Sequence, residues 1–368
     1  MATGAPLVVL AAGGTGGHLF PAEALSHALH AKGARVVLMT DTRAKQYARD
    51  FPAEAVHAVP AATPSGGSPL KKLAALLQLG KGVLAARGLM KELKPDVVVG
   101  FGGYPSVPPV LGASLAGMRT LIHEQNAVVG RANRFLAGRA DVIATGFAEV
   151  GGLSAAAKAK CRQVGNPVRP AVLAVAGEAY GWPAQGKVEL LVFGGSQGAR
   201  VMADIVPPAI QLLTPEERAR ISIVQQARAE DEERVRGLYE TLGVQADIAP
   251  FFKDLPARMA KAHLVIARSG ASTVAELGVI GRPSILVPLP GSLDQDQAAN
   301  AAVLEGIGAA IRILQPDFTP RRLASELSQL LQQPAHLTTM AANAKSAGIP
   351  DAAERLAALV LDTARPKT

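Results

Sequence analysis

Two glycine-rich turns are the segments of this chain best suited to bind an anion. Residues 13–18 read Gly-Gly-Thr-Gly-Gly-His after the apolar run Leu7–Ala12, and residues 194–199 read Gly-Gly-Ser-Gln-Gly-Ala after Val188–Phe193. An apolar run followed by glycines and a helix-compatible stretch predicts a buried strand that passes into a helix. Backbone N–H groups and the helix dipole at such a turn attract phosphate. Two copies half a chain apart predict two nucleotide-type domains.

The glycine spacing differs from the G-x-G-x-x-G pattern of dinucleotide-binding folds. Leu19 stands where the first turn needs its last glycine, and Ser196 where the second turn needs its middle one. Asp41 ends the second predicted strand, where a ribose-binding acid would lie. A lone Asp at a strand end is usually a cap or turn residue, so the pattern argues against NAD.

His18 closes the first turn and could take a proton from a sugar hydroxyl as a general base, or could simply cap the loop.

Residues 268–276, Arg-Ser-Gly-Ala-Ser-Thr-Val-Ala-Glu, follow a predicted strand and open a helix. Their hydroxyl and N–H groups predict another anion site. Glu276, one turn further, could accept the hydroxyls of a ribose; the alternative is that it only decorates the helix.

Further polar segments follow predicted strands or turns. Residues 102–106 read Gly-Gly-Tyr-Pro-Ser, residues 123–126 His-Glu-Gln-Asn, residues 130–133 Gly-Arg-Ala-Asn, and residues 294–300 Asp-Gln-Asp-Gln-Ala-Ala-Asn. Amides donate and accept hydrogen bonds and so suit sugar hydroxyls. The same residues could instead form a structural hydrogen-bond network. Asp294 and Asp296 have the spacing of a metal motif but belong to the amide-rich segment, so no metal or cofactor is expected.

The order of the predicted elements indicates an α/β fold. Short Val-rich runs alternate with helical stretches in both halves, which predicts parallel sheets built from right-handed βαβ units. The segment Gly165-Asn166-Pro167 marks a turn between the halves. We expect a first domain over residues 1–166, a second over 167–345, and a C-terminal helix within 346–368 that could pack back on the first domain.

Composition excludes several classes of protein. The 368 residues are 49% hydrophobic and 18% charged, as expected of a folded globular chain. The single cysteine, Cys161, excludes an intrachain disulfide. The net charge is +8, yet no basic patch interleaved with aromatics points to nucleic acid. Without a leader or an apolar run of about 18 residues, a protein without a transmembrane segment is expected.

The segment Leu70–Lys94 combines leucines with Lys and Arg, and Glu92 is its only acidic residue. An apolar face bordered by cations suits a helix that lies on an anionic lipid surface. The alternative is an ordinary amphipathic helix that packs on the sheet. Gly80, Gly82 and Gly88 argue against one long continuous helix.

The motifs GGTGGH, GGYPS, HEQN, GNPVR, GGSQGAR, RSGAST and DQDQAANA occur together in this order. The chain resembles the MurG family, bacterial transferases that add N-acetylglucosamine from its UDP donor to undecaprenyl-diphosphate-linked muramyl-pentapeptide in peptidoglycan synthesis. The resemblance spans about Leu7 to Ala353. It implies a GT-B architecture, two Rossmann-like domains with a cleft between them, and a peripheral enzyme at the cytoplasmic face of the membrane.

The resemblance also implies roles for individual residues. His18 is the candidate catalytic base, and the second domain holds most of the UDP-N-acetylglucosamine. Phe252 presents its backbone to the uracil, residues 271–276 cover the phosphates and ribose, and the acceptor lies on the first domain. The implied substrate-binding residues are Thr15, Gly16, Gly17, Asn126, Arg169, Ser196, Phe252, Ala271, Ser272, Thr273, Val274, Ala275, Glu276, Gln297 and Asn300.

Two segments depart from the family pattern. Many relatives have His-Gln-Ser/Thr-Gly where this chain has Gln225-Gln226-Ala227-Arg228, which questions a diphosphate role for that loop. Gln295 stands where His or Arg is more common, and Asp296 stands where Gln is more common.

The reaction that the resemblance implies inverts the anomeric carbon in one displacement. A UDP-sugar epimerase, another glycosyltransferase and a nucleotide-sugar-binding regulator remain as alternatives.

Overall fold

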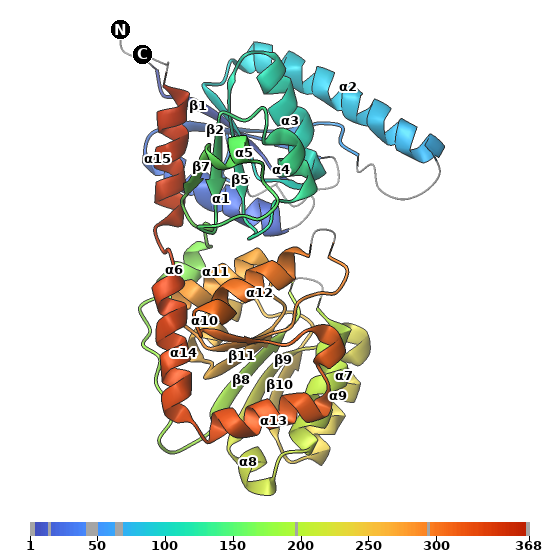
Figure 1. The fold of residues 1–368 in the computed structure, drawn as a ribbon, viewed down its shortest axis with the longest axis vertical. Helices are drawn as coiled ribbons and strands as arrows, with labels where there is room; N and C mark the ends of the chain where they lie inside the picture. Colours follow the sequence, from blue (N-terminus) through green and yellow to red (C-terminus); the bar gives the residue numbers. More distant parts are fainter. Residues whose placement is uncertain are drawn as a thin grey trace. The chain divides into compact units, whose positions relative to one another are not determined.

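The structure is a computed structural model that describes residues 4–13, 16–41, 51–62, 69–195, 198–292 and 295–365; the side chains of residues 16 and 69–72 are not described. The chain divides into two compact units (Figure 1). The first comprises Met1–Arg169 together with Asp351–Thr368, and the second comprises Pro170–Pro350. Each unit is built around its own sheet, in which all paired strands run parallel.

The sheet of the first unit has the order β3-β2-β1-β4-β5-β6-β7. Its strands are β1 Leu7–Ala11, β2 Arg35–Thr40, β3 Ala55–Ala58, β4 Val97–Gly100, β5 Arg119–Glu124, β6 Val142–Thr145 and β7 Cys161–Gln163. The helices of this unit are α1 Gly16–Ala31, α2 Pro69–Leu93, α3 Gly103–Leu115, α4 Arg131–Leu136, α5 Ala155–Lys158 and α15 Ala352–Ala364.

Helices bury both faces of this first sheet, which explains why β1 is a continuous apolar run. Val8 and Leu10 lie in a core shared with Leu25 of α1 and Leu356 of α15. The alternate residues of β1, such as Val9, lie in the opposite core with residues of α2, α3 and α4. Successive side chains of a strand point to opposite faces, so a strand covered on both sides must be apolar throughout.

The sheet of the second unit has the order β10-β9-β8-β11-β12-β13. Its strands are β8 Val188–Phe193, β9 Ile221–Gln226, β10 Gln245–Ala249, β11 Leu264–Ala267, β12 Ser284–Leu286 and β13 Ala310–Arg312. Its helices are α6 Pro170–Val175, α7 Arg200–Gln211, α8 Pro215–Ala219, α9 Ala229–Thr241, α10 Leu255–Lys261, α11 Ala271–Ile280, α12 Asp296–Gly306, the 3-10 helix η2 Gln315–Asp317, α13 Pro320–Leu331 and α14 Pro334–Ala347.

The limits of the two units differ by a few residues from those expected. The first unit extends to Arg169 rather than 166, because Val168 is buried and the guanidinium of Arg169 lies 5.2 Å from the ring centroid of Phe20 on α1. The second unit extends to Pro350 rather than 345, because Gly348 lies against Gly278 of α11. The last helix, α15, packs against α1, β4 and β5 of the first unit.

Each sheet has one place where the strand order reverses direction. In the first sheet this topological switch point lies between β1 and β4, and in the second it lies between β8 and β11. Open α/β sheets bind ligands outside the carboxyl ends of the strands at such points. The two glycine-rich turns follow β1 and β8, so both turns lie at a switch point.

Helix α2 is continuous from Pro69 to Leu93, contrary to the expectation drawn from its glycines. Gly82 fits because the chain at Pro60 passes directly against it, with the Pro60 carbonyl oxygen 2.0 Å from where a Cβ would stand. Among the described helices, the stretch Leu73–Leu93 is the one that is long and apolar enough to cross a membrane by length and composition, with mean hydropathy 1.3. The expectation that no apolar stretch reaches about 18 residues is therefore corrected by Leu73–Leu93.

Candidate active site

The imidazole of His18 lies against the glycine turn that follows β4. His18 is the third residue of α1 and is half-buried. A Cβ placed on Gly103 would stand 3.2 Å from both Cδ2 and Nε2 of this ring, and one on Gly102 would stand 3.5 Å from Cε1. Both glycines have positive φ, 82° and 65° for Gly102 and Gly103. The turns after β1 and β4, on either side of the switch point, thus meet at His18.

The polar quartet at the end of β5, residues 123–126, belongs mostly to the structural hydrogen-bond network of the fold. His123 is fully buried; its Nε2 lies 3.0 Å from the carbonyl oxygen of Gly165, and its Nδ1 lies 3.3 Å from Nε2 of Gln125. Gln125 also donates to the Phe101 carbonyl at 2.9 Å. Burial lowers the pKa of His123 to about 4, and the nearby His18 acts in the same direction. His123 is therefore neutral near pH 7, with its proton on Nε2.

Glu124 holds the segment that leads to Asn126. Its Oε1 accepts hydrogen bonds from the backbone N and Nδ2 of Asn126 at 3.0 and 3.2 Å. Its Oε2 accepts from the Gly130 N–H at 3.1 Å and from Nδ2 of Asn133 at 2.8 Å. Burial raises the pKa of the Glu124 carboxyl, and these four hydrogen bonds act against that rise. The half-buried Asn126 is thereby fixed in place.

Asn133 links this network to the turn beside His18. Its Nδ2 also donates to the His123 carbonyl at 3.1 Å, and it stands 3.3 Å from the Cβ position of Gly102. Asn166, which the sequence indicated only as part of a linker, donates to the Gln125 carbonyl at 2.8 Å. Of the two imidazoles at this sheet edge, His18 is partly exposed, whereas His123 is fully buried.

The remaining candidate residues of the first unit lie near the start of α1. Gly16 and Gly17 form the first two residues of that helix, and Arg169 stacks on Phe20 one turn further. Thr15 lies outside the described residues. Pro21 lies five residues after the start of α1, inside the helix.

The turn after β8 is packed too tightly for any residue but glycine at its first position. A Cβ on Gly194 would stand 2.2 Å from the backbone nitrogen of Ala199. The Gly194 N–H donates to Oε1 of Gln226 at 3.0 Å, and the Gln226 amide donates to the Pro250 carbonyl at 3.1 Å. Gln226 therefore fixes this turn to the neighbouring strands. Ser196 lies outside the described residues.

Helix α11 begins at Ala271 with Gly270 as its N-cap, and no described side chain caps it. Within the described ranges, the backbone N–H groups of its first turn have no side-chain cap, and they lie at the other side of the switch point from the β8 turn. Ala271, Ser272, Thr273 and Ala275 are half-buried, whereas Val274 and Glu276 are buried. The first turn of α11 is thus partly exposed, and its role in binding phosphate stays a prediction.

The amides of Gln297 and Asn300 tie α12 to this helix start. The Gln297 side-chain oxygen accepts from the Leu289 N–H at 3.0 Å, and its carbonyl accepts from the Ser269 hydroxyl at 2.8 Å. Asn300 is fully buried and donates to the Ser269 carbonyl at 3.2 Å. Both residues lie at the C-terminal edge of the second sheet. In this structure the Gln297 amide supports the loop between β12 and α12, and the Asn300 amide supports the loop between β11 and α11.

Phe252 follows β10 and is buried beneath Arg258, whose guanidinium lies 4.3 Å from the ring centroid. Arg258 in turn forms ion pairs with Asp247 at 2.6 Å and Asp254 at 2.8 Å. The neighbouring Phe251 is 61% exposed. The Phe252 ring is thus part of the core. Its backbone is the part that the resemblance assigns to contact with the uracil base.

Arg268 begins the segment 268–276 but was given no role of its own from the sequence, and Gln315 was not singled out. Arg268 is buried and donates to the carbonyls of Val287 and Pro288 at 3.0 and 2.9 Å and to the side-chain oxygen of Gln315. It therefore holds the segment that leads into the amide-rich loop. A charged residue directly after the buried strand β11 is the signal that could have identified Arg268, whereas nothing in the sequence marks Gln315.

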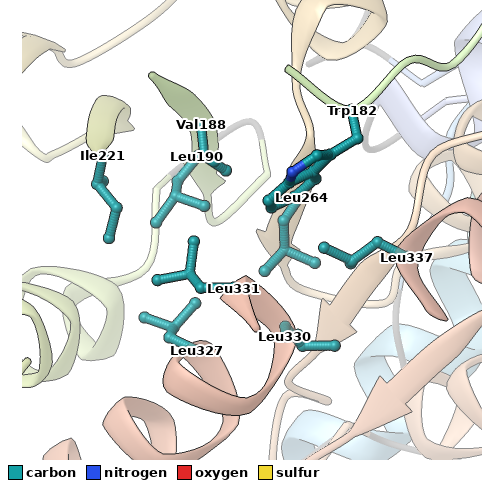
Figure 2. A pocket seen from close by; sticks show the side chains of 9 residues that line it. All are labelled: Trp182, Val188, Leu190, Ile221, Leu264, Leu327, Leu330, Leu331 and Leu337. Atoms are coloured by element: carbon teal, nitrogen blue, oxygen red, sulfur yellow. The ribbon is translucent and has the colours of Figure 1, made fainter. Parts of the chain in front are cut away.

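The small cavity in the core of the second unit is not part of this site (Figure 2). Its volume is about 10 Å³, which is room for about one water molecule. Its lining is Trp182, Val188, Leu190, Ile221, Leu264, Leu327, Leu330, Leu331 and Leu337. It is an apolar packing gap, too small for a sugar. Within the described ranges, no group of three or more His, Cys, Asp or Glu residues could hold a metal ion.

Comparison with known proteins gives matches over nearly the whole chain. The glycosyltransferase family 28 N-terminal domain matches residues 8–145, and the C-terminal domain of that family matches residues 189–356. A UDP-N-acetylglucosamine–N-acetylmuramyl-(pentapeptide) pyrophosphoryl-undecaprenol N-acetylglucosamine transferase from Methylobacterium nodulans is 61% identical over 99% of this chain and 98% of its own. Its counterpart from Methylobacterium sp. is 60% identical over the same shares.

The crystal structure of Acinetobacter baumannii MurG superposes with a TM-score of 0.81 at 30% identity, covering 97% of this chain and 99% of that one. The two parallel-sheet domains are those of a GT-B glycosyltransferase. With identity of this degree over this length, the chain belongs to glycosyltransferase family 28 and, within it, to the MurG family of hexosyltransferases.

Proposed function

We propose that this protein transfers N-acetylglucosamine from UDP-N-acetylglucosamine to the C4 hydroxyl of undecaprenyl-diphosphate-linked N-acetylmuramyl-pentapeptide, with inversion at the anomeric carbon. The observation that carries the proposal is the difference between the two switch points. One presents a half-buried imidazole at His18, and the other presents a glycine turn beside an uncapped helix start at Ala271. The first suits deprotonation of a hydroxyl, and the second suits a diphosphate.

The proposed mechanism is a single displacement. The acceptor hydroxyl attacks the anomeric carbon of the donor, His18 accepts the hydroxyl proton, and UDP leaves. Negative charge develops on the UDP phosphates as the bond breaks. The N–H groups and dipole at the start of α11 oppose that charge. Asn126, which Glu124 holds in a fixed position, is proposed to orient the donor sugar.

The experiment is a transfer assay with labelled UDP-N-acetylglucosamine and a muramyl-pentapeptide lipid analogue. We expect UDP and the disaccharide lipid to form in equal amounts, with an inverted anomeric configuration. Conversion of the donor to an epimer without transfer would favour an epimerase. Binding of the donor without any turnover would favour a regulatory protein.

We further propose that α2 docks the protein on the anionic cytoplasmic surface of the membrane, where the lipid acceptor resides. One face of α2 packs on α3 through residues that include Ala86 and Met90. Leu73, Leu77 and Leu84 share another face and are exposed, Leu84 to 69%, and Leu76 is exposed as well. Figure 1 shows α2 projecting from the body of the first unit. Exposed Lys81, Arg87 and Lys91 accompany these leucines.

This composition suits a helix that lies in the membrane interface with its cations at the lipid head groups. We expect the double variant Lys81→Glu, Arg87→Glu to bind vesicles containing phosphatidylglycerol about 10-fold more weakly or worse, since each cation contributes about 1 kcal/mol. Its affinity for UDP should not change. Lys72 belongs to the same basic segment, but its side chain lies outside the described part.

The matched control is Lys187→Glu, Lys261→Glu, which makes the same change of charge at exposed residues of the second unit. Vesicle sedimentation measures both variants. If both double variants bind vesicles equally weakly, the effect comes from net charge alone, and α2 is rejected as the docking element.

A further inference from the structure

Arg228 is the last residue before α9 and lies beside the glycine turn that follows β8. Strand β9 pairs with β8 in parallel, so the residues after the two strands emerge at the same sheet edge. The Cγ of Arg228 lies 3.1 Å from where a Cβ on Gly198 would stand. Gly198 has a φ of 67°, a conformation that favours glycine. Because Gly198 has no side chain, Arg228 can lie across the turn.

Much of the hydrogen-bonding capacity of Arg228 is left over in this position. Its Nη2 makes a long contact of 3.4 Å to the Gly198 carbonyl, and its Nη1 lies 3.9 Å from Oε1 of Glu230. Its Nε is buried and has no hydrogen-bond partner among the residues that the structure describes. A guanidinium offers five donors in a planar fork that matches the oxygens of a phosphate.

The turn itself has already used part of its backbone. The Gly194 N–H is bound by Gln226, and the Gly198 N–H donates to the Gly195 carbonyl at 3.0 Å. These two N–H groups are not available to an anion without breaking the fold. A cationic side chain against the same turn can supply the missing attraction for a phosphate.

We infer that Arg228 binds a phosphate of the nucleoside diphosphate at the β8 turn. This inference rests on the proposed function, because it takes the donor to be a UDP-sugar. Arg228 would contribute to donor binding and would oppose the charge that develops on UDP. The Gln225-Gln226-Ala227-Arg228 segment would then take part in diphosphate binding, with Gln226 as a positioning residue and Arg228 as the group in contact.

The test compares the binding of UDP, UMP and uridine by calorimetry in the wild type, Arg228→Ala and Arg228→Lys. We expect Arg228→Ala to weaken UDP binding about 10- to 100-fold, as for loss of hydrogen bonds to a charged group. Uridine binding should stay within about 2-fold, because uridine carries no phosphate. Arg228→Lys should restore part of the loss, since lysine keeps the charge but not the fork.

The matched control is Arg220→Ala, because Arg220 precedes β9 as Arg228 follows it. Arg220 is exposed and lies 5.9 Å from the Trp182 ring centroid. Its loss removes the same charge at the N-terminal end of β9, away from the β8 turn, so UDP affinity should be unchanged.

Three outcomes would overturn the inference. Equal UDP affinity in Arg228→Ala and wild type would reject Arg228 while leaving the proposed function intact. An equal loss for uridine and UDP would assign Arg228 a purely structural role in the turn. Failure of the wild type to bind UDP would overturn the proposed function and the inference together.

Discussion

The two units share one plan but build different sites on it. In each, a strand ends in a glycine turn at a topological switch point. In the first unit, strand β5 ends in the buried residues His123 and Glu124 and is followed by the buried Gln125; these side chains hydrogen-bond one another or the backbone. In the second unit the loops are tied by amides to backbone groups, and the helix start at Ala271 has no described side-chain cap. The same fold thus positions an imidazole in one unit and, as far as the described residues show, a helix start without a side-chain cap in the other.

The contrast is tested most strongly by removing the imidazole. His18→Ala should lower kcat by about 10²–10⁴-fold, the range for loss of a general base. The affinity for UDP should remain unchanged, because the proposed phosphate site belongs to the second unit. Steady-state kinetics of transfer and calorimetry with UDP measure the two effects.

The control is His27→Ala, since His27 lies on the same helix and is exposed. Its kcat should equal that of the wild type. Turnover of His18→Ala close to normal with the lipid-linked acceptor would exclude His18 as the base and would remove the functional difference between the two turns.

The buried His123 gives the next largest effect, on stability rather than on turnover. Its pKa is about 4 in the folded protein and about 6.5 when unfolded, so between these values the unfolded state binds the extra proton. Stability from this residue is complete above about pH 6.5 and is lost as the pH falls toward 4. The loss should reach about 3 kcal/mol.

Urea unfolding of wild type and His123→Gln as a function of pH measures this loss. Glu124 titrates in the opposite sense, because burial raises its pKa and favours the folded state at low pH. The difference between the two proteins isolates His123. A difference that stays constant from pH 4 to 7 would mean that His123 is not held neutral by burial.

The interior of each sheet could be predicted from the sequence, whereas the edges could not. Strands β1, β4 and β8 are apolar runs because helices cover both their faces. The strands that are harder to recognise in the sequence are β3, β7, β10 and β13, which are the outermost strands of the two sheets. They are short and partly exposed, as in β7 Cys161–Gln163, so they leave no apolar run to recognise.

The parts of the candidate site that depend on local backbone structure could be predicted from the sequence. The helix start at Ala271 and the glycine turns follow directly from strand–turn–helix patterns. Long-range partners could not be predicted, because their contacts depend on how the elements pack. Asn133 meets Gly102, and Gln315 meets Arg268, across 47 residues of chain in the second case.

A smaller change to the first site is to crowd His18 without removing it. Gly103→Ala would place a methyl group 3.2 Å from the His18 ring, so the ring must shift by a few tenths of an ångström. We expect kcat to fall about 10-fold, because misplacement of a reacting group is costly. The positive φ of 65° should also cost about 1–2 kcal/mol of stability.

Gly117→Ala separates these two effects. Gly117 has a φ of 73°, and a Cβ there would meet nothing within 4 Å. It should lose similar stability but no turnover. If both variants lose kcat equally, the effect belongs to backbone strain and not to the position of His18.

The smallest expected effect lies in the second unit, where Gln315→Ala removes one of the partners of Arg268. Arg268 keeps its bonds to the Val287 and Pro288 carbonyls, so the loop should loosen without being displaced. The KM for the donor should rise about 3- to 5-fold, with kcat within about 2-fold, as for loss of about 1 kcal/mol of hydrogen bonding. The exposed Gln245 at the start of β10 provides the control, Gln245→Ala, which should leave both constants unchanged. A fall in kcat at constant KM would place this loop in the chemical step, and the separation of proton transfer and donor binding between the two units would then fail.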